Sequence, residues 1–153
     1  MIAAPYVAAI SLLTTDAKGI HPVKPIPYDA AEAIAEECNA HPNYSNPAVP
    51  GDEMCVAVYV HHSFRESGWD LYAVGDGGHS FGPFQVQGRA PRSWRDAVAQ
   101  FAPLLRRASV CQEPLEMLAT GKCGTDVGAR ISKTRMRESA QLVGQVWLAG
   151  RTD

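Results

Sequence analysis

The sequence predicts a single compact domain that is mostly α-helical and carries a glycine-rich loop or a small hairpin. Its 153 residues suit one domain with its own hydrophobic core. Helix start signals and apolar residues at helical spacing recur from residue 29 to the end of the chain. Glycine is concentrated in residues 74–90, where the sequence VGDGGHSFGPFQVQGRA predicts a loop or a hairpin rather than a helix.

Residues 1–28 are predicted to form an extended N-terminal arm ahead of a domain that spans residues 29–153. The sequence HPVKPIP (21–27) favours an extended backbone, because proline fixes φ and the residue before it avoids the helical region. The apolar start, residues 1–13, has no Lys or Arg before it and is interrupted by Pro5, so it matches a signal peptide poorly. We expect a packed or docked arm, which offers a contact for a protein partner.

Helix start signals follow this arm. Asp29 and Glu32 have the spacing of a capping box, which predicts a helix ending near Asn39. Asp52 is expected to cap a helix over residues 53–67. The run MCVAVYV within it is apolar on every side, which is typical of a central, buried helix, although a buried strand has a similar composition.

The second half of the chain predicts three further helices. Ser93 is expected to cap a helix that ends near Ser109 and is bent or split at Pro103. The remaining expected segments are a turn-rich connection over 41–51, a short helix over 113–119 and a long last helix over 127–149.

The four cysteines are an even number and allow three complete pairings. Our preferred pairing joins Cys111 to Cys123 around a short loop, which leaves Cys38 to pair with Cys55. Free, buried thiols are the equally weighted alternative. Disulfides imply an oxidising destination, and no pair has the CxxC spacing of a zinc site.

Charge and motif content exclude several classes of function. The net charge is -2, so no basic field favours nucleic acid. No apolar run approaches the roughly 20 residues that span a bilayer. The glycine-rich loop lacks the Lys-Ser/Thr of a phosphate-binding loop, and the chain has no G-x-S-x-G elbow for a nucleophilic serine.

Glu66 is the leading candidate for a catalytic residue. It stands at the end of the buried helix, where the glycine-rich region approaches, so its carboxyl group is expected to be half desolvated. Desolvation raises a carboxyl pKa, which a general acid needs in order to keep its proton. Phe64, Trp69 and Tyr72 are expected to supply an apolar wall. Taken alone, these features also fit a solvated glutamate at a helix end.

A wider motif around Glu66 resembles a known active site. Glu66-Ser67-Gly68 is followed by the glycine-rich loop and by the turn Gly82-Pro83-Phe84-Gln85. This arrangement resembles the active-site signature of goose-type lysozymes and soluble lytic transglycosylases, and it covers residues 52–88, about a quarter of the chain.

The resemblance implies an α+β lysozyme-like fold and cleavage of the β-1,4 bond between N-acetylmuramic acid and N-acetylglucosamine in peptidoglycan, with no cofactor. It implies that Glu66 protonates the leaving oxygen and that Ser67 orients Glu66. Gln85 is expected to shape the sugar site, although ordinary turn and cap hydrogen bonds also explain Ser67 and Gln85. The other substrate-binding residues expected on this basis are Ser80, Gly82, Phe84 and Gln87.

Asp76 is the candidate second carboxylate. It falls where the resemblance places one catalytic-site aspartate of goose-type lysozymes, and the other falls at Gln87, which cannot ionise. Asp76 is expected to act either as the base that activates water or as a residue that closes an Asx-turn. Without a base, the acetamido and 6-hydroxyl groups of the sugar complete the reaction and give a 1,6-anhydro product.

Two features of the C-terminal part of the chain give the resemblance no support. Leu118 stands where lytic transglycosylases usually carry a tyrosine that contacts the catalytic glutamate, and Tyr59 or Tyr72 could take that role. The resemblance implies that the basic residues over 130–137 lie near the substrate, but the favoured interpretation is a solvated face of the last helix.

Two rival hypotheses remain. His61, His62, Glu66 and His79 are suitable metal ligands, but their spacing is not that of H-E-x-x-H. The other rival is a non-catalytic docking module that binds a partner through residues 1–28. The peptidoglycan hypothesis places the protein at the bacterial cell wall or periplasm, and the poor signal peptide favours a bacteriophage lysin or another virion-associated or assembly-borne carrier.

Overall fold

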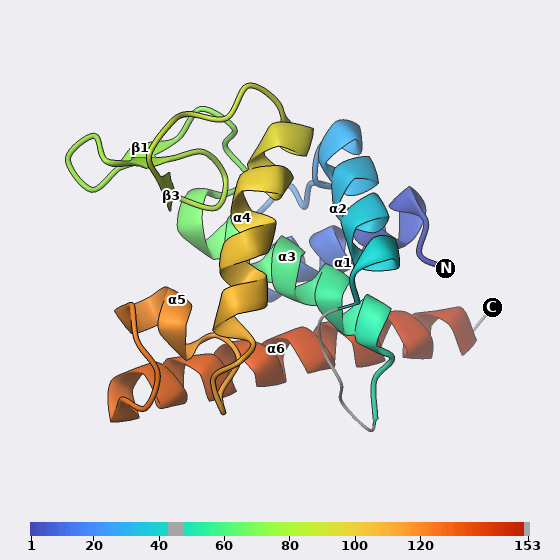
Figure 1. The fold of residues 1–153 in the computed structure, drawn as a ribbon. Helices are drawn as coiled ribbons and strands as arrows, with labels where there is room; N and C mark the ends of the chain where they lie inside the picture. The colour runs from blue at the N-terminus through green and yellow to red at the C-terminus, as the bar shows by residue number, and fades with distance from the viewer. Residues whose placement is uncertain (43–47, 152–153) are drawn as a thin grey trace.

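The computed structural model describes residues 1–42 and 48–151, and this part of the chain confirms a mostly α-helical fold. Of the expected connection over 41–51, residues 43–47 lie outside the described residues. The helices are α1 (Ala4–Ala17), α2 (Tyr28–Ala40), α3 (Gly51–Ser67), α4 (Trp94–Ala108), α5 (Glu116–Thr120) and α6 (Asp126–Arg151). A small sheet lies between α3 and α4 in the sequence and projects at one end of the molecule (Figure 1).

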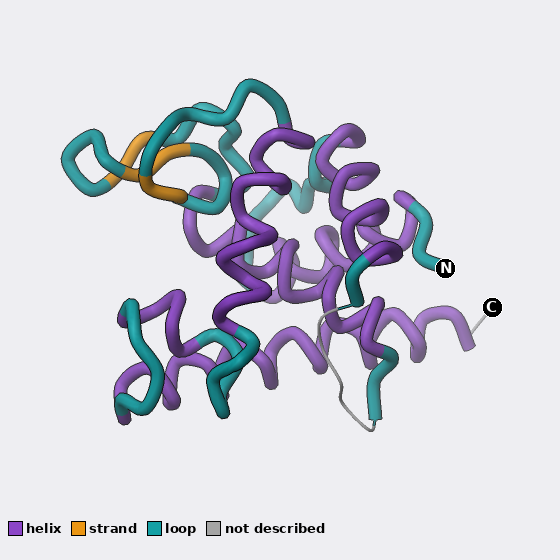
Figure 2. The backbone as a smooth tube through the Cα atoms, in the orientation of Figure 1, coloured by secondary structure: helices purple, strands orange, loops and turns teal. Residues whose placement is uncertain are grey.

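Helix α3 runs through the centre of the domain and packs against α1, α2 and α6 (Figures 1 and 2). Every residue from Met54 to Ser63 is buried. This confirms the central helix that the all-apolar run predicted, because a helix without a polar face is stable only when it is enclosed. The long helix α6 extends along the opposite side of α3 from α2 (Figure 1).

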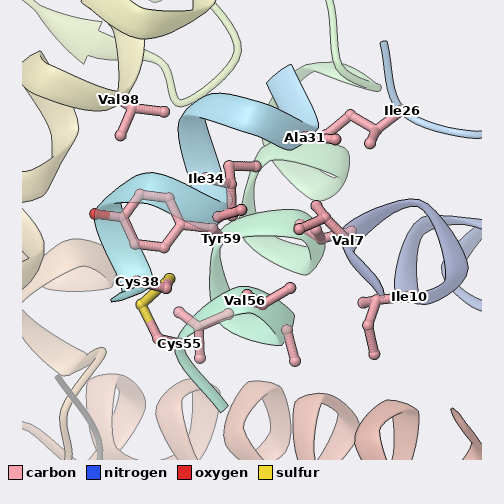
Figure 3. Packing of buried hydrophobic residues seen from close by; sticks show 14 of the residues in the cluster. Val7, Ile10, Ile26, Ala31, Ile34, Cys38, Cys55, Val56, Tyr59 and Val98 are labelled. Carbon is pink, nitrogen blue, oxygen red and sulfur yellow. A yellow bond between two sulfur atoms is a disulfide. The ribbon is translucent and has the colours of Figure 1, made fainter. Parts of the chain in front are cut away.

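The hydrophobic core gathers around α3 (Figure 3). Val7 of α1 and Ile34 of α2 are fully buried beside Val56 and Tyr59 of α3. The Tyr59 ring also makes edge-to-face contacts with Phe84 and with the Phe101 ring of α4, at centroid distances of 5.7 and 5.6 Å. The core is therefore continuous with the turn over residues 82–85, which connects the second and third strands of the small sheet.

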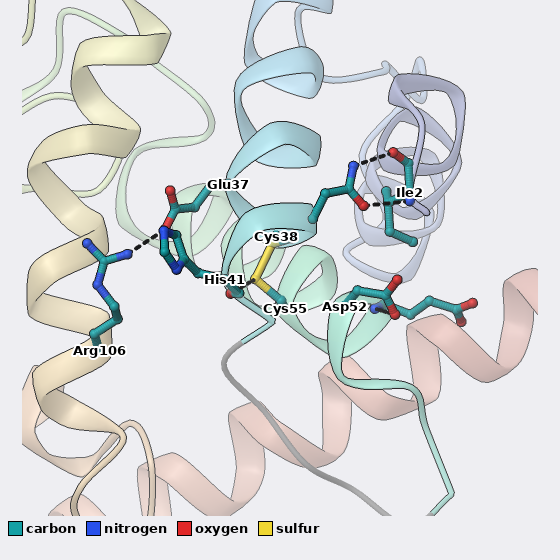
Figure 4. The surroundings of a disulfide bond; sticks show 9 residues. Ile2, Glu37, Cys38, His41, Asp52, Cys55 and Arg106 are labelled. Carbon is teal, nitrogen blue, oxygen red and sulfur yellow. Dashed lines mark hydrogen bonds and ion pairs between the residues drawn. A yellow bond between two sulfur atoms is a disulfide. The ribbon is translucent and has the colours of Figure 1, made fainter.

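The expectation of an extended arm over residues 1–28 is wrong for Ala4–Ala17, which form α1. Pro5 lies in the first turn of this helix, where its missing N–H costs no hydrogen bond. Apolar residues of α1 face the core, and Ile2 exchanges two backbone hydrogen bonds with the Asn39 side chain of α2 (Figure 4). Residues 1–3 and 18–27 lack a helix or strand, so the proline-rich stretch 21–27 is non-helical, as predicted.

The helix caps are partly as predicted. Ser93 caps α4 by accepting a hydrogen bond from the Asp96 N–H, and α4 continues through Pro103 without a split. The predicted capping box of α2 is wrong, because α2 begins with Pro27 as its N-cap and Asp29 lies inside the first turn. The predicted cap of α3 by Asp52 is wrong in the same way, because Pro50 is the N-cap and Asp52 lies in the first turn. In both helices the acidic residues of the first turn still favour the helix through its dipole.

Both predicted disulfides are present. Cys38 of α2 is bonded to Cys55 of α3, with Cα atoms 5.7 Å apart (Figure 4). Cys111 is bonded to Cys123, with Cα atoms 5.5 Å apart, and closes the loop that contains α5. The alternative of free thiols is wrong, since the chain has no free cysteine.

The glycine-rich region folds as a three-stranded antiparallel sheet of very short strands, β1 (Val74–Gly75), β2 (Ser80–Phe81) and β3 (Val86–Gln87). Ser80 pairs with Gly75 on one side and with Gln87 on the other. The expected hairpin is thus extended by a third strand. Among residues 1–42 and 48–151, no helix has the length and apolar character needed to cross a membrane.

The Cys38–Cys55 disulfide is predicted to stabilise the packing of α2 on α3. Replacing both cysteines with alanine is expected to lower the free energy of unfolding by about 3 kcal/mol, because the cross-link that restricts the unfolded chain is lost. Urea denaturation measures the change. In the Cys111→Ala/Cys123→Ala variant the Cys38–Cys55 bond is the remaining disulfide, so reducing this variant removes the same bond without mutating Cys38 or Cys55. An unchanged unfolding midpoint in both experiments would contradict the prediction.

Candidate active site

A cleft of about 510 Å³ opens between the small sheet, α4 and α5. Glu66 reaches it from the end of α3, and Asp76 and Gln85 reach it from the sheet and its turns. Phe101 of α4 and Leu118 of α5 contribute apolar surface. The cleft thus combines two carboxylates with an apolar wall.

Local sequence signals explain why α3 ends beside the cleft. Gly68 has a left-handed backbone, with φ of 65°, and its N–H donates to the Phe64 carbonyl, which ends the helix. Trp69 then folds back so that its indole N–H donates to the Val60 carbonyl and its ring packs on Phe64 at 4.9 Å. The last turn of α3, which carries Glu66, is fixed by these contacts.

The carboxyl group of Glu66 is partly buried, with 31% of its side chain exposed. Burial raises the pKa of Glu66, and the nearby Asp76 carboxylate raises it further. The positive charges of Arg135 and Arg65 act in the opposite direction without cancelling the increase. A carboxyl group in this environment keeps its proton to higher pH than a solvated glutamate, which suits a general acid.

Arg135 of α6 lies directly beside Glu66, so the predicted solvated face over 130–137 is wrong at this position. Its Nη1 atom is 3.7 Å from Glu66 Oε1 and donates to His62 Nδ1 at 3.2 Å. Only 16% of the Arg135 side chain is exposed. Its neighbours Lys133 and Arg137 do face solvent, as the charge pattern indicated.

His62 is buried behind Glu66 and is held neutral. Its ring stacks on Phe101 at 5.0 Å, and burial lowers its pKa to about 3. Because Arg135 has only donors, His62 Nδ1 must accept, and the ring proton then resides on Nε2. That Nε2 atom lies 3.9 Å from Glu66 Oε1.

Asp76 lies in the cleft at a position of constrained backbone geometry. Its φ is 51°, in the left-handed region that aspartate tolerates better than most residues. The turn is closed by the Gly78 and His79 N–H groups, which both donate to the Gly75 carbonyl. The Asp76 carboxylate instead accepts a short hydrogen bond from the Ser80 hydroxyl, so backbone bonds make the turn and the carboxylate faces the cleft.

Ser67 supports the turn between β2 and β3 and does not orient Glu66 as expected. Its Oγ lies 2.9 Å from the Pro83 carbonyl oxygen and accepts from the Asp70 N–H. Ser67 therefore connects the end of α3 to the turn that carries Gln85. Neither Ser67 nor Gly82, both expected to bind substrate, lines the cleft.

The turn from Gly82 to Gln85 depends on two glycines, Gly82 within the turn and Gly75 in β1. Gly82 has φ of 77°, and a Cβ there would lie 2.6 Å from Pro91 Cγ. Gln85 itself has φ of 51°, and its amide donates to the Gly82 carbonyl. The Gln85 Oε1 atom lies so close to Gly75 that a Cβ at Gly75 would collide with it. Gln85 is thus held at the cleft wall by contacts on both sides.

Most of the predicted site residues meet in this cleft. Those that line it are Glu66, Asp76, Ser80, Phe84, Gln85 and Gln87. Phe84 is only 3% exposed and stacks on Phe101 at 4.4 Å, so it mainly joins the cleft to the core. The apolar wall expected from Phe64, Trp69 and Tyr72 is wrong, because other residues provide it and Tyr72 is 82% exposed.

Several cleft residues were missed from the sequence. Gln100, Leu104 and Arg107 line the cleft from one face of α4. The spacing of the α4 residues is that of one helical face, but no motif marks it. Leu118 lines the cleft where a tyrosine was considered, while Tyr59 is enclosed in the core. Neither Tyr59 nor Tyr72 takes the place of that tyrosine.

The residues proposed as metal ligands diverge. His61 turns toward α6, where its Nε2 lies 2.6 Å from Glu138, whereas His62 faces Glu66. His79 is exposed in the turn between β1 and β2. The one group of potential ligands found among the described residues contains Cys111 and Cys123, whose sulfur atoms are bonded to each other.

Comparisons with known proteins do not assign the chain to a family. No family model matches it, and no curated protein and no solved structure matches it either. The cleft geometry and the short motif from Glu66 to Gln85 are therefore the grounds for a functional proposal.

Removal of the Arg135 charge is predicted to raise the pKa of Glu66. The Arg135 guanidinium stabilises the Glu66 carboxylate and so lowers its pKa. In Arg135→Gln this effect is lost, while burial and Asp76 continue to raise the pKa. Titration of the Glu66 carboxyl carbon by NMR measures the shift. Arg137→Gln, an exposed change in the same helix, is the matched control, and equal pKa values in the two variants would contradict the electrostatic role of Arg135.

Loss of the Ser67 hydroxyl is predicted to loosen the turn that carries Gln85. Ser67→Ala removes the bond to Pro83 and is expected to cost about 1 kcal/mol of unfolding free energy. Faster amide exchange at Gln85, whose N–H donates to the Gly82 carbonyl, should accompany it. Ser109→Ala, at the exposed end of α4, serves as the control. Identical exchange at Gln85 in both variants would refute the connection.

Proposed function

We propose that the protein cleaves the β-1,4 bond between N-acetylmuramic acid and N-acetylglucosamine in peptidoglycan, with Glu66 as the general acid. The observation that carries the proposal is the environment of Glu66: a partly buried carboxyl group with a raised pKa, set in a cleft beside a second carboxylate. The resemblance of the surrounding motif to goose-type lysozymes and lytic transglycosylases supplies the substrate class.

In the proposed reaction, Glu66 donates its proton to the glycosidic oxygen as the bond from that oxygen to C1 breaks. In the hydrolytic route, Asp76 removes a proton from water, and the water oxygen bonds to C1. In the lytic route, the 6-hydroxyl oxygen of the muramyl sugar bonds to C1, and its proton passes to the Glu66 carboxylate. The position of the Asp76 carboxylate supports the hydrolytic route. Backbone hydrogen bonds close the turn around Asp76, so its carboxylate is not needed for the turn and lines the cleft.

The location proposed for the activity is the bacterial cell wall or periplasm. Two disulfides in a chain of this size are typical of proteins that work in an oxidising compartment. A bacteriophage lysin or a wall-opening enzyme carried by a larger assembly would meet the polymer there. The proposed binding partner is the glycan strand of peptidoglycan. We do not propose that the protein binds nucleic acid.

The docking alternative receives less support from the fold. It relied on residues 1–28 as an arm that reaches a partner. Val7 and Ile10 of this segment are fully buried against α2 and α3, so the inner face of α1 belongs to the core of the domain. We therefore make no second proposal through this segment.

Mass spectrometry of soluble fragments released from purified peptidoglycan tests the proposal. We expect fragments from the wild type and none from Glu66→Gln, which keeps the shape of the side chain but cannot donate the proton. Glu36→Gln is the control, because Glu36 pairs with Arg95 on the outer surface and should leave cleavage unchanged.

The chemical ends of the fragments distinguish the two routes. Free reducing ends identify a hydrolase with Asp76 as base, and 1,6-anhydro ends identify a lytic transglycosylase. A well-folded wild type that releases no fragments from several wall types would overturn the proposed activity.

A further inference from the structure

Helix α4 presents a stripe of three side chains to the cleft: Gln100, Leu104 and Arg107. Their spacing of four and three residues places them on one helical face. Seven residues at a rise of 1.5 Å each separate Gln100 from Arg107 by about 10 Å along the helix axis. The α4 stripe therefore forms an extended wall of the cleft, with an amide, an aliphatic group and a cation in sequence.

The amide of Gln100 has an unused donor. Its Nε2 atom is buried and has no hydrogen-bond partner among the described residues. A buried donor without a partner is unfavourable, and such groups are expected to be satisfied by water or by a ligand. Because Gln100 lines the cleft, a carbonyl group of a bound ligand is well placed to accept from it.

Arg107 carries a positive charge that is not compensated within the described part of the protein. The neighbouring Arg106 turns away from the cleft and donates to Glu37 of α2 at 2.8 Å (Figure 4). Arg107 lines the cleft and makes no ion pair with a described residue. The two carboxylates that line the same cleft, Glu66 and Asp76, belong to α3 and the sheet, so α4 presents the positive charge on a separate wall.

We infer that the α4 stripe recognises the substituted muramyl sugar of the glycan strand through its carboxylate-bearing side group. This sugar carries a lactyl ether that ends in a carboxyl group or continues into a peptide with carboxylates, and it also carries an acetamido carbonyl. Gln100 donates to an amide carbonyl, Leu104 contacts the lactyl methyl group, and Arg107 pairs with the carboxylate.

The inference rests on the proposed function for its substrate class and adds a basis for selectivity. N-acetylglucosamine polymers have the acetamido groups but lack the lactyl carboxylate. Recognition by Arg107 therefore distinguishes muramyl strands from neutral strands, while recognition by Gln100 serves both kinds of strand.

Binding measured in a Glu66→Gln background separates recognition from cleavage. The probes are soluble peptide-free glycan strands, which retain the lactyl carboxylate, and neutral β-1,4-linked N-acetylglucosamine oligomers. Arg107→Gln is expected to weaken binding of the muramyl strands about fivefold, the size of a partly exposed charge pair, and to leave the neutral oligomers within about twofold.

Arg106→Gln is the matched control, because it removes the same charge from the adjacent position outside the cleft. If Arg107→Gln binds muramyl strands as well as Arg106→Gln does, the carboxylate contact is refuted. An equal loss of both probes in Arg107→Gln also refutes it, because a carboxylate contact acts on muramyl strands alone.

Gln100→Met tests the amide contact. It is expected to weaken binding of both probes and to leave the thermal stability undiminished, because the lost donor has no partner among the described residues. Unchanged binding of both probes overturns the role of Gln100.

The outcomes also separate this inference from the proposed activity. A wild type that cleaves peptidoglycan without any dependence on Arg107 keeps the activity and overturns the inference. Binding that depends on Arg107, without release of fragments by the wild type, keeps the recognition and overturns the activity.

Discussion

The enclosure of α3 on all sides is the constraint on which the rest of the structure depends. Residues Met54 to Ser63 are buried by α1, α2 and α6, and the Cys38–Cys55 disulfide holds the start of the helix against α2. Sliding or rotating such a helix would expose apolar surface at a cost of about 25 cal/mol per Å². The last turn of α3 is consequently fixed, and Glu66 is delivered to one place at the edge of the cleft.

The charge state of Glu66 follows from opposing neighbours around this fixed point. Burial and Asp76 favour the protonated acid, and Arg135 favours the carboxylate. His62 adds no positive charge beside Glu66, because burial against Phe101 keeps its ring neutral. A charged imidazole at 3.9 Å would add a second cation and further stabilise the carboxylate. Packing of the core thus helps Glu66 to keep its proton.

Sequence signals predicted those parts of the fold whose causes are local. Ser93 predicts the start of α4 because its side chain caps that helix, and the apolar run in α3 predicts a buried helix. Helix α1 was not predicted, because its stability comes from burying Val7 against distant helices rather than from caps or charge pairs. In the cleft, the local motif found Glu66 and Asp76. Arg135 was assigned to a solvated face because its contact with Glu66 exists only once α6 packs against α3.

The pH dependence of glycan cleavage by the wild type, measured under single-turnover conditions, tests the role of Glu66 most directly. A general acid works only while it is protonated, so the rate should fall as the pH rises through the pKa of Glu66. Burial places that pKa above the ordinary glutamate value of about 4.3. We predict that the alkaline limb of the profile lies above this value and coincides with the direct titration of the Glu66 carboxyl group. A rate that is independent of pH across that titration would contradict the assignment of Glu66 as the acid.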